Sequence, residues 1–225
     1  MWKQALAAIL AATLMVVFPT SLLQDDNVFT HGSREEPIIA LTFDDGPHPA
    51  YTDKILDVLA KHGVKATFFP IGVNVENYPE PLLRALVEGH EIGNHTYHHK
   101  NLRSIPYEEM LTEITTTAHR IHDLTGRSVS LIRPPQGAMS AQFLSLVGEL
   151  GYRVVLWDVD TRDWDGASVE QMVGNIMANT DNGDIILFHD YHRNAANTVR
   201  TLDIIIPRLM EQGFRFVTVS ELLDG

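Results

Sequence analysis

Two adjacent acids, Asp44 and Asp45, end the apolar run Ile38–Phe43 and are followed by the turn-forming pair Gly46-Pro47. Two like charges side by side repel each other unless a cation neutralises one of them. One interpretation is that Asp45 binds a metal ion and Asp44 is a general base. Because the turn ends the strand, the two side chains need not point to opposite faces. The alternative is that both acids merely cap the following helix.

His95 and His99 are spaced so that, on a helical turn, both imidazoles would lie on one face and could bind one ion. The chain has eleven histidines, so this spacing alone is weak evidence. It gains weight because Asp45 could supply a third ligand. Two nitrogens and one oxygen suit a divalent first-row metal, zinc first, with cobalt, iron or nickel as alternatives. Three protein ligands leave a position open for water, which is typical of a catalytic site.

Arg133 and His189 each follow an apolar run later in the chain. A guanidinium beside the base would keep the carboxylate ionised and fix its orientation. A protonated His189 could donate to a leaving amine, with Asp160 or Asp163 as the carboxylate that raises its pKa. The alternatives are a surface arginine and a core histidine that is bonded to the backbone.

From residue 37 onward, short β-rich apolar runs alternate with segments of helical period. The expected strands are Ile38–Phe43, Ala66–Ile71, Glu91–Asn94, Val129–Arg133, Arg153–Trp157, Ile185–Phe188 and Phe214–Val219. The expected helices are Tyr51–His62, Pro81–Glu88, Tyr107–Leu124, Ala141–Leu150, Ser168–Asn179 and Thr198–Gln212. This alternation predicts a parallel sheet with helices outside.

The polar clusters fall at the carboxyl ends of five of the expected strands: 44–45, 94–99, 133–137, 158–164 and 189–190. In a parallel βα barrel these ends share one rim, so the clusters would converge on one site. The first strand is not followed by GxGxxG, and a P-loop pattern is absent, which removes the usual nucleotide-binding interpretations. The formal net charge of −12 argues against nucleic acid or anionic lipid as a partner.

The first 24 residues differ from the rest of the chain. Lys3 is their only charge, and Ala5–Phe18 is an apolar run interrupted only by Thr13. This pattern predicts an export signal or an uncleaved membrane anchor through residues 5–23. Residues 25–36 read as a polar linker, and residues 37–223 as the catalytic domain. The protein is therefore expected to be secreted, or membrane-anchored with that domain outside the cytoplasm.

Five segments in this order, TFDDGP, NHTYHHKNL, RPPQG, DTRDW and LFH, resemble the polysaccharide deacetylases of carbohydrate esterase family 4, the NodB-like domain. The resemblance covers about residues 35–223. It implies an α/β fold, a distorted (β/α)7 barrel, and metal-dependent removal of acetyl groups from polysaccharides, commonly from N-acetylglucosamine. By position, it implies Asp44 as the base and Arg133 as the residue that orients it. The implied metal ligands are Asp45, His95 and His99.

The same resemblance implies His189 as the acid and Asp163 as the partner that tunes it. It places Leu187 and Trp164 around the acetyl methyl group. Gln136 is a departure, because the family commonly has tyrosine there, with a backbone N–H that is thought to hold the oxyanion. Backbone donation survives a side-chain change, so we expect the chemistry to be retained while the substrate contact surface differs.

These inferences predict an exported hydrolase that removes acetyl groups from N-acetylglucosamine in chitin oligomers or peptidoglycan. An O-deacetylase of acetylated xylan would need the same machinery. Two other classes are a non-catalytic glycan-binding relative and an unrelated metal hydrolase acting on a phosphoester or cyclic amide. The first would lack a ligand or the acid, and the second would usually need a second metal site.

Overall fold

The computed structural model describes residues 27–192 and 195–225. The segment predicted to be a signal or anchor, residues 1–24, lies outside this part. Within the described ranges, each helix is too short or too polar to cross a membrane.

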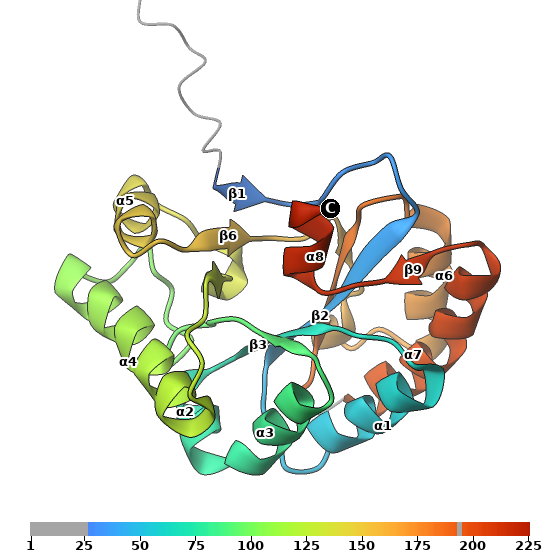
Figure 1. The fold of residues 1–225 in the computed structure, drawn as a ribbon, viewed down its shortest axis with the longest axis horizontal. Coiled ribbons are helices and arrows are strands. Elements are labelled where there is room, and N and C mark those ends of the chain that lie inside the picture. Colours follow the sequence, from blue (N-terminus) through green and yellow to red (C-terminus); the bar gives the residue numbers. More distant parts are fainter. Residues whose placement is uncertain (1–26, 193–194) are drawn as a thin grey trace, which may run out of the picture.

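The strands form two parallel runs that together make the barrel (Figure 1). One run has the order β4-β3-β2-β8-β7, and the other has the order β1-β6-β5. A parallel bridge between Asn94 and Ile132 joins the runs on one side, and β6 continues along the chain into β7 on the other. The strands are β1 (Val28–Phe29), β2 (Ile38–Asp45), β3 (Thr67–Pro70), β4 (Glu91–Ile92), β5 (Leu131–Ile132), β6 (Arg153–Val155), β7 (Val159–Asp160), β8 (Ile185–His189) and β9 (Arg215–Phe216). This arrangement confirms the predicted distorted βα barrel.

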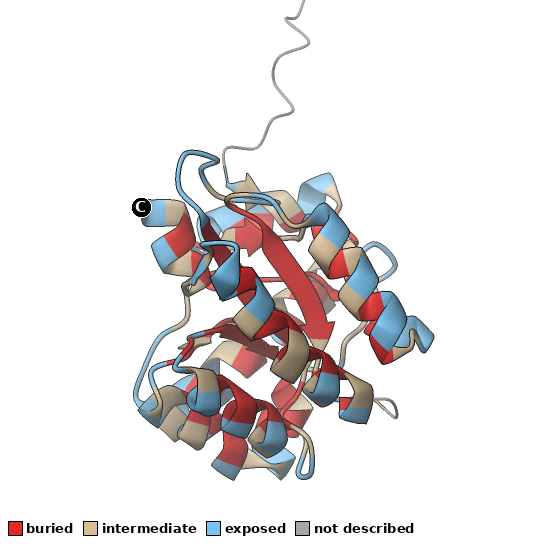
Figure 2. Ribbon diagram, turned by 90° about the vertical axis from the view of Figure 1, so that its right-hand side faces the viewer, coloured by how far each residue is buried: buried red, intermediate tan, exposed pale blue. Residues whose placement is uncertain are grey.

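Helices surround the strands and expose their outer faces to solvent, whereas the central strands are buried (Figure 2). They are α1 (Thr52–His62), α2 (Gly72–Asn77), α3 (Pro79–Val87), α4 (Tyr107–Thr125), α5 (Ala141–Glu149), α6 (Val169–Asn179), α7 (Ala195–Glu211) and α8 (Val219–Asp224). Gly63 and Gly126 end α1 and α4 in the left-handed conformation, which glycine adopts without a steric penalty.

The alternation of side chains along β2 separates two apolar layers. Leu41 and Phe43 pack outward in one cluster with residues of α1 and α7. Ile38 and Ala40 belong to a second cluster, with residues of β5, β6 and β8, inside the barrel. Burying a side chain such as Phe43 stabilises the fold by roughly 1.5–3 kcal/mol. The inward face then continues toward the carboxyl end of β2 with polar side chains, and there the site begins.

The chain after the last predicted strand differs from the expectation. The strand β9 covers only Arg215–Phe216, and Val219 begins helix α8. Thr218 and Glu221 form a capping box, which satisfies backbone donors at the helix start. Leu222 of α8 packs into the interior cluster. The end of the chain therefore closes the amino-terminal end of the barrel. The short elements α2, β1 and β7 are also absent from the sequence-based expectation.

The segment predicted to be a linker takes part in the barrel over its described part, residues 27–36. Strand β1 pairs with β6, and His31 forms a bridge with Asp184. Arg34 forms ion pairs with Asp158 and Asp184. These contacts tie the segment to the amino-terminal end of the sheet.

Candidate active site

Asp44 lies on the inward face of β2 and is only 3% exposed. The buried Arg133 donates from one nitrogen to Asp44 Oδ1 at 2.8 Å and to Thr42 Oγ1 at 2.9 Å. Its other N–H groups donate to the carbonyl oxygens of Val155 and Leu156. Because every arm of the guanidinium is held, Arg133 fixes the Asp44 carboxylate in one orientation. It is not a surface arginine.

Asp45, the next residue, turns toward the same site through an unusual backbone conformation. Strand alternation would send its side chain outward beside Phe43. Asp45 instead has φ 78°, in the left-handed region, which costs a non-glycine residue about 1–3 kcal/mol. Its Oδ1 lies 3.6 Å from His95 Nε2 and 3.4 Å from His99 Nε2. The left-handed residue therefore brings two consecutive carboxylates to one side.

The segment that carries His95 and His99 is irregular, so the predicted helical turn is wrong. Thr96 and His99 both have positive φ, at 66° and 58°. The two imidazole rings nevertheless lie 5.0 Å apart between centroids. They converge through a loop rather than through helical periodicity.

Side-chain acceptors hold this loop in place of helical carbonyls. The Asn94 side chain accepts from the Thr96 N–H, and one oxygen of Glu113, from α4, accepts from the N–H groups of Tyr97 and His98. The other oxygen of Glu113 bonds to the ring of His98. His98 is thus exposed and locally bonded, outside the site. The sequence did not single out Glu113, since an acid on a helix gives no sign of a distant loop that it will hold.

Asp45, His95 and His99 together form a donor set for one cation. One ligand atom from each lies within 4.8 Å of the other two. Around a tetrahedral zinc ion, ligand atoms are about 3.3 Å apart, near the two distances from Asp45 Oδ1. That oxygen is buried and has no hydrogen-bond partner among the described residues, as expected of an atom reserved for an ion.

The protonation states of His95 and His99 are also those that a metal ligand needs. His95 Nδ1 lies 2.7 Å from the Arg133 carbonyl oxygen, which can only accept, so Nδ1 carries the proton. This leaves the Nε2 lone pair toward Asp45. Burial lowers the pKa of His95 and of His99, which favours the neutral imidazole that binds metal ions.

His189 ends β8, where it pairs in register with Asp44 on β2. Its Nδ1 lies 2.8 Å from Asp163 Oδ1, and its backbone N–H donates to Asp163 Oδ2. Burial disfavours the charged ring, but the hydrogen bond and the charge of Asp163, together with the carboxylates of Asp44 and Asp45, outweigh it. They raise the pKa of His189 to about 9. The ring is therefore protonated near neutral pH and can act as an acid.

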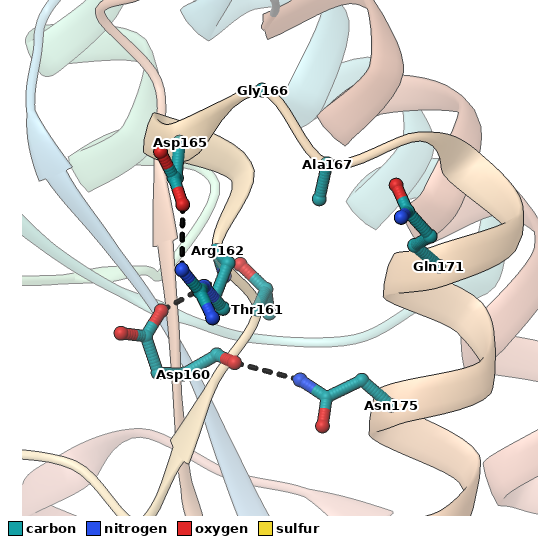
Figure 3. Close-up of a pocket in the computed structure, with 8 residues that line it drawn as sticks. All are labelled: Asp160, Thr161, Arg162, Asp165, Gly166, Ala167, Gln171 and Asn175. Atoms are coloured by element: carbon teal, nitrogen blue, oxygen red, sulfur yellow. Dashed lines mark hydrogen bonds and ion pairs between the residues drawn. The ribbon is translucent and has the colours of Figure 1, made fainter.

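Asp163, and not Asp160, contacts His189. The Asp160 carboxylate accepts from the Arg162 N–H, and its carbonyl oxygen accepts from Asn175 (Figure 3). The carboxylate also accepts from the Trp164 ring N–H. Burial opposes ionisation of Asp163, yet its bonds from His189 outweigh this effect and hold its pKa well below the usual range. Asp163 is therefore charged beneath the His189 ring.

A pocket of about 330 Å³ joins these groups. Its walls are Asp44, Asp45, His95, His99, Gln136, Trp157, Asp160, Trp164, Leu187 and His189. Arg133 and Asp163 do not line the pocket but contact two residues that do, Asp44 and His189. A larger, polar pocket of about 610 Å³ adjoins it and shares Asp160 (Figure 3). Trp157 was not predicted as a site residue, although an aromatic residue at the end of an expected strand was a usable signal.

Gln136 lies at the edge of the pocket with an exposed side chain and φ 60°. Its side-chain oxygen accepts from the Asn101 amide at 3.1 Å. The side chain therefore meets solvent and lies outside the group of Asp44, Arg133, His189 and Asp163.

The comparison with known proteins agrees with this geometry. Residues 31–155 match the sequence profile of the family described as polysaccharide deacetylase. The chain belongs to that family. Its predicted class, a metal-dependent deacetylase, is thereby confirmed, and the triad described above has a geometry that could hold the metal ion such enzymes require.

The family includes several similar proteins of established name. A peptidoglycan-N-acetylglucosamine deacetylase of Bacillus cereus is 42% identical over 84% of this chain and 89% of the relative. A chitooligosaccharide deacetylase of Azorhizobium caulinodans is 36% identical over 81% of this chain and 92% of its own. Among solved structures, the Bc1960 peptidoglycan N-acetylglucosamine deacetylase superposes with a TM-score of 0.86 at 39% identity, covering 88% of this chain and 93% of that one.

Proposed function

We propose that this deacetylase hydrolyses the acetamido group of N-acetylglucosamine units in peptidoglycan or chitin-type oligomers, releasing acetate and a free amine. One observation carries the proposal. The cation-binding triad, the oriented carboxylate of Asp44 and the protonated ring of His189 line a single pocket.

The triad Asp45, His95 and His99 would hold one divalent ion, with zinc first and cobalt or another first-row metal as alternatives. When bound, such an ion polarises a carbonyl oxygen and makes water more acidic. The mix of two imidazole nitrogens and one carboxylate oxygen supports this choice. Three protein ligands leave room for substrate and water.

Asp44 is the general base. Its Oδ2 lies 3.7 Å from His95 Nε2, so its free oxygen stands next to the ligand atoms. Arg133 occupies the other oxygen and keeps it from rotating away. Asp44 therefore takes the proton from the attacking water as the oxygen–carbon bond forms.

His189 is the general acid. It donates a proton to the departing nitrogen as the carbon–nitrogen bond breaks, and Asp163 stabilises the charged ring before the transfer. An amide nitrogen leaves poorly as an anion, so a proton donor with a pKa of about 9 matters more for an amide than for an ester. This observation favours N-deacetylation over the O-deacetylation of xylan.

The apolar part of the pocket suits the acetyl methyl group. Leu187 is buried at its base, and Trp164 and Trp157 add aromatic walls. The backbone N–H of Gln136 is proposed as a donor to the oxyanion, in the family manner. The exposed Gln136 side chain would contact the glycan beside the scissile group.

The relatives support the proposed substrate and location. A peptidoglycan-N-acetylglucosamine deacetylase and a chitooligosaccharide deacetylase are both similar to this chain. A cell-wall glycan lies outside the cytoplasm, which agrees with the predicted export signal or anchor in residues 1–24. We therefore propose that the catalytic domain works outside the cytoplasm, either secreted or anchored through residues 5–23.

Acetate release tests this function directly. Purified residues 27–225 are stripped with a chelator, then loaded with zinc or cobalt, and assayed on chitin oligomers, peptidoglycan and acetylated xylan. We expect acetate from the two N-acetylglucosamine substrates, loss after chelation and recovery with metal. Acetate from xylan alone, or activity that survives complete removal of metal, would contradict the proposal.

A further inference from the structure

Asp190 is a buried carboxylate that the proposed mechanism does not use. It follows His189 in the polar cluster 189–190 and is 1% exposed, and no sequence motif assigned it a role of its own. Burial raises the pKa of Asp190 to about 7, while hydrogen bonds from Thr52 and Gly46 act in the opposite direction. Placing an ionisable group there is unfavourable, so its contacts point to a role other than packing.

Asp190 contacts the residues on either side of Asp45. Its backbone N–H donates to the carbonyl oxygen of Asp44 at 3.1 Å. Its Oδ1 accepts from the Gly46 N–H at 2.8 Å, and its Oδ2 accepts from the Thr52 hydroxyl at 2.5 Å. One residue thus holds the backbone immediately before and immediately after Asp45.

Asn74 binds the carbonyl oxygen of Asp45 itself. Its amide donates to the Asp45 carbonyl oxygen at 2.7 Å, from helix α2. The Gly46 carbonyl in turn accepts from the Ile71 N–H. The left-handed Asp45 is therefore enclosed by bonds at each neighbouring peptide group, and these bonds offset the cost of its conformation.

The fit between Asp190 and the turn is close. A Cβ added to Gly46 would lie 2.1 Å from Asp190 Oδ2, well inside van der Waals contact. Gly46 has no positive φ, so the closeness of the carboxylate explains a glycine here.

We propose that Asp190, together with Asn74, is a positioning residue for the metal triad: it holds Asp45 in the conformation that aims its carboxylate at His95 and His99. This inference rests on the proposed metal site. Without the clamp, Asp45 would relax to an extended conformation, and strand alternation would turn its side chain away from the histidines.

The experiment measures zinc affinity by competition with a chromophoric chelator, and the visible spectrum of the cobalt-loaded protein, in the wild type and in variants. In Asp190→Ala we expect a 10- to 100-fold loss of zinc affinity, about the range known for residues that support metal ligands, and an altered cobalt spectrum. Excess zinc should restore most of kcat with KM unchanged. In Asp190→Asn, which keeps the acceptor for Gly46, affinity should stay close to that of the wild type.

Asp184 supplies a matched control. It is also a buried aspartate, 2% exposed. Asp184 immediately precedes β8 and Asp190 immediately follows it, so the two residues lie about 20 Å apart at 3.3 Å per strand residue. Asp184→Ala, the same substitution at the other end of β8, should lower Tm but leave zinc affinity and the cobalt spectrum unchanged.

Wild-type affinity and an unchanged spectrum in Asp190→Ala would overturn the inference. If Asp190→Ala does not fold, Asn74→Ala decides in the same assay, and unchanged affinity there overturns it. A wild-type protein that binds neither metal at the triad would refute the proposed function itself, a different outcome from these.

Discussion

The two halves of the site are built in different ways. The proposed acid–base pair, Asp44 and His189, lies on neighbouring strands in register and follows ordinary strand alternation. The proposed ligand triad, Asp45, His95 and His99, depends on bends, with positive φ at Asp45 and His99. The residues proposed for proton transfer are thus placed by the rigid sheet, whereas the proposed cation site is placed by strained turns that buried acceptors hold. Substitutions at Asp44 or His189 should therefore lower the rate of acetate release, and substitutions around the triad should lower metal affinity.

The sharpest test of this division is Asp44→Asn. Asparagine keeps an oxygen for Arg133, so the site should remain intact while the base is lost. We expect acetate release from chitin oligomers to fall about 10⁴-fold, the upper end for general base catalysis, with one metal still bound. Metal content and activity are measured on the same sample. Full activity in this variant would refute the role of Asp44.

On the acid side, His189→Ala should separate substrates by leaving group. We expect a loss of about 10²- to 10³-fold on N-acetylglucosamine oligomers, and a much smaller loss on an activated aryl acetate, whose leaving group needs no proton. The two rates are compared in one preparation. Equal losses on both substrates would mean that His189 does not donate the proton.

In the triad, His99→Ala should weaken zinc binding by more than the 10- to 100-fold that is usual for residues that only support ligands. His98→Ala is the neighbouring control, because His98 is exposed and bonds to Glu113 instead. Chelator competition measures both variants. Similar zinc affinities in the two variants would contradict the proposal that His99 is a metal ligand and His98 is not.

The partner of the acid should control the pH profile. Because the acid must be protonated, activity falls as pH rises through the pKa of His189, which Asp163 helps to raise to about 9. Asp163→Asn removes that charge, so the alkaline limb should move to lower pH, by about one unit or more. The profile of kcat/KM measures the shift. An unmoved limb, or one moved to higher pH, would contradict the pairing.

The smallest effect is expected at the exposed rim. Gln136→Tyr should change the relative rates on chitin oligomers and peptidoglycan by less than about tenfold, since changing an exposed side chain leaves no buried polar group unpaired and so discriminates only weakly between substrates. The pH profile should stay as in the wild type. A shifted profile would show that the side chain enters proton transfer.

Much of the acid–base pair was predictable. The run Ile38–Phe43 identifies a buried strand, and the polar residues after it must emerge at the carboxyl rim of a parallel barrel. The same reasoning places Arg133 and His189 there. The choice between Asp160 and Asp163 rested on the family pattern, because sequence spacing does not tell which of two acids in one short loop reaches a distant histidine.

The triad was predicted in its members but not in its geometry. The spacing of His95 and His99 suggested a helical turn, yet the loop is held by Glu113, an acceptor from a distant helix. Likewise, the bond from Gly46 to Asp190 spans 144 positions in sequence. Local patterns carry no information about such partners. The short helix α8 was also missed, although the capping box of Thr218 and Glu221 is a local pattern that could have predicted it.

The most direct test is anomalous diffraction at the zinc edge from crystals grown with one equivalent of zinc. We predict a single peak within bonding distance, about 2.0–2.2 Å, of the Asp45 carboxylate and of Nε2 of His95 and His99. The absence of a peak between these three side chains, or a peak bound by other residues, would contradict the metal site on which the deacetylase chemistry depends.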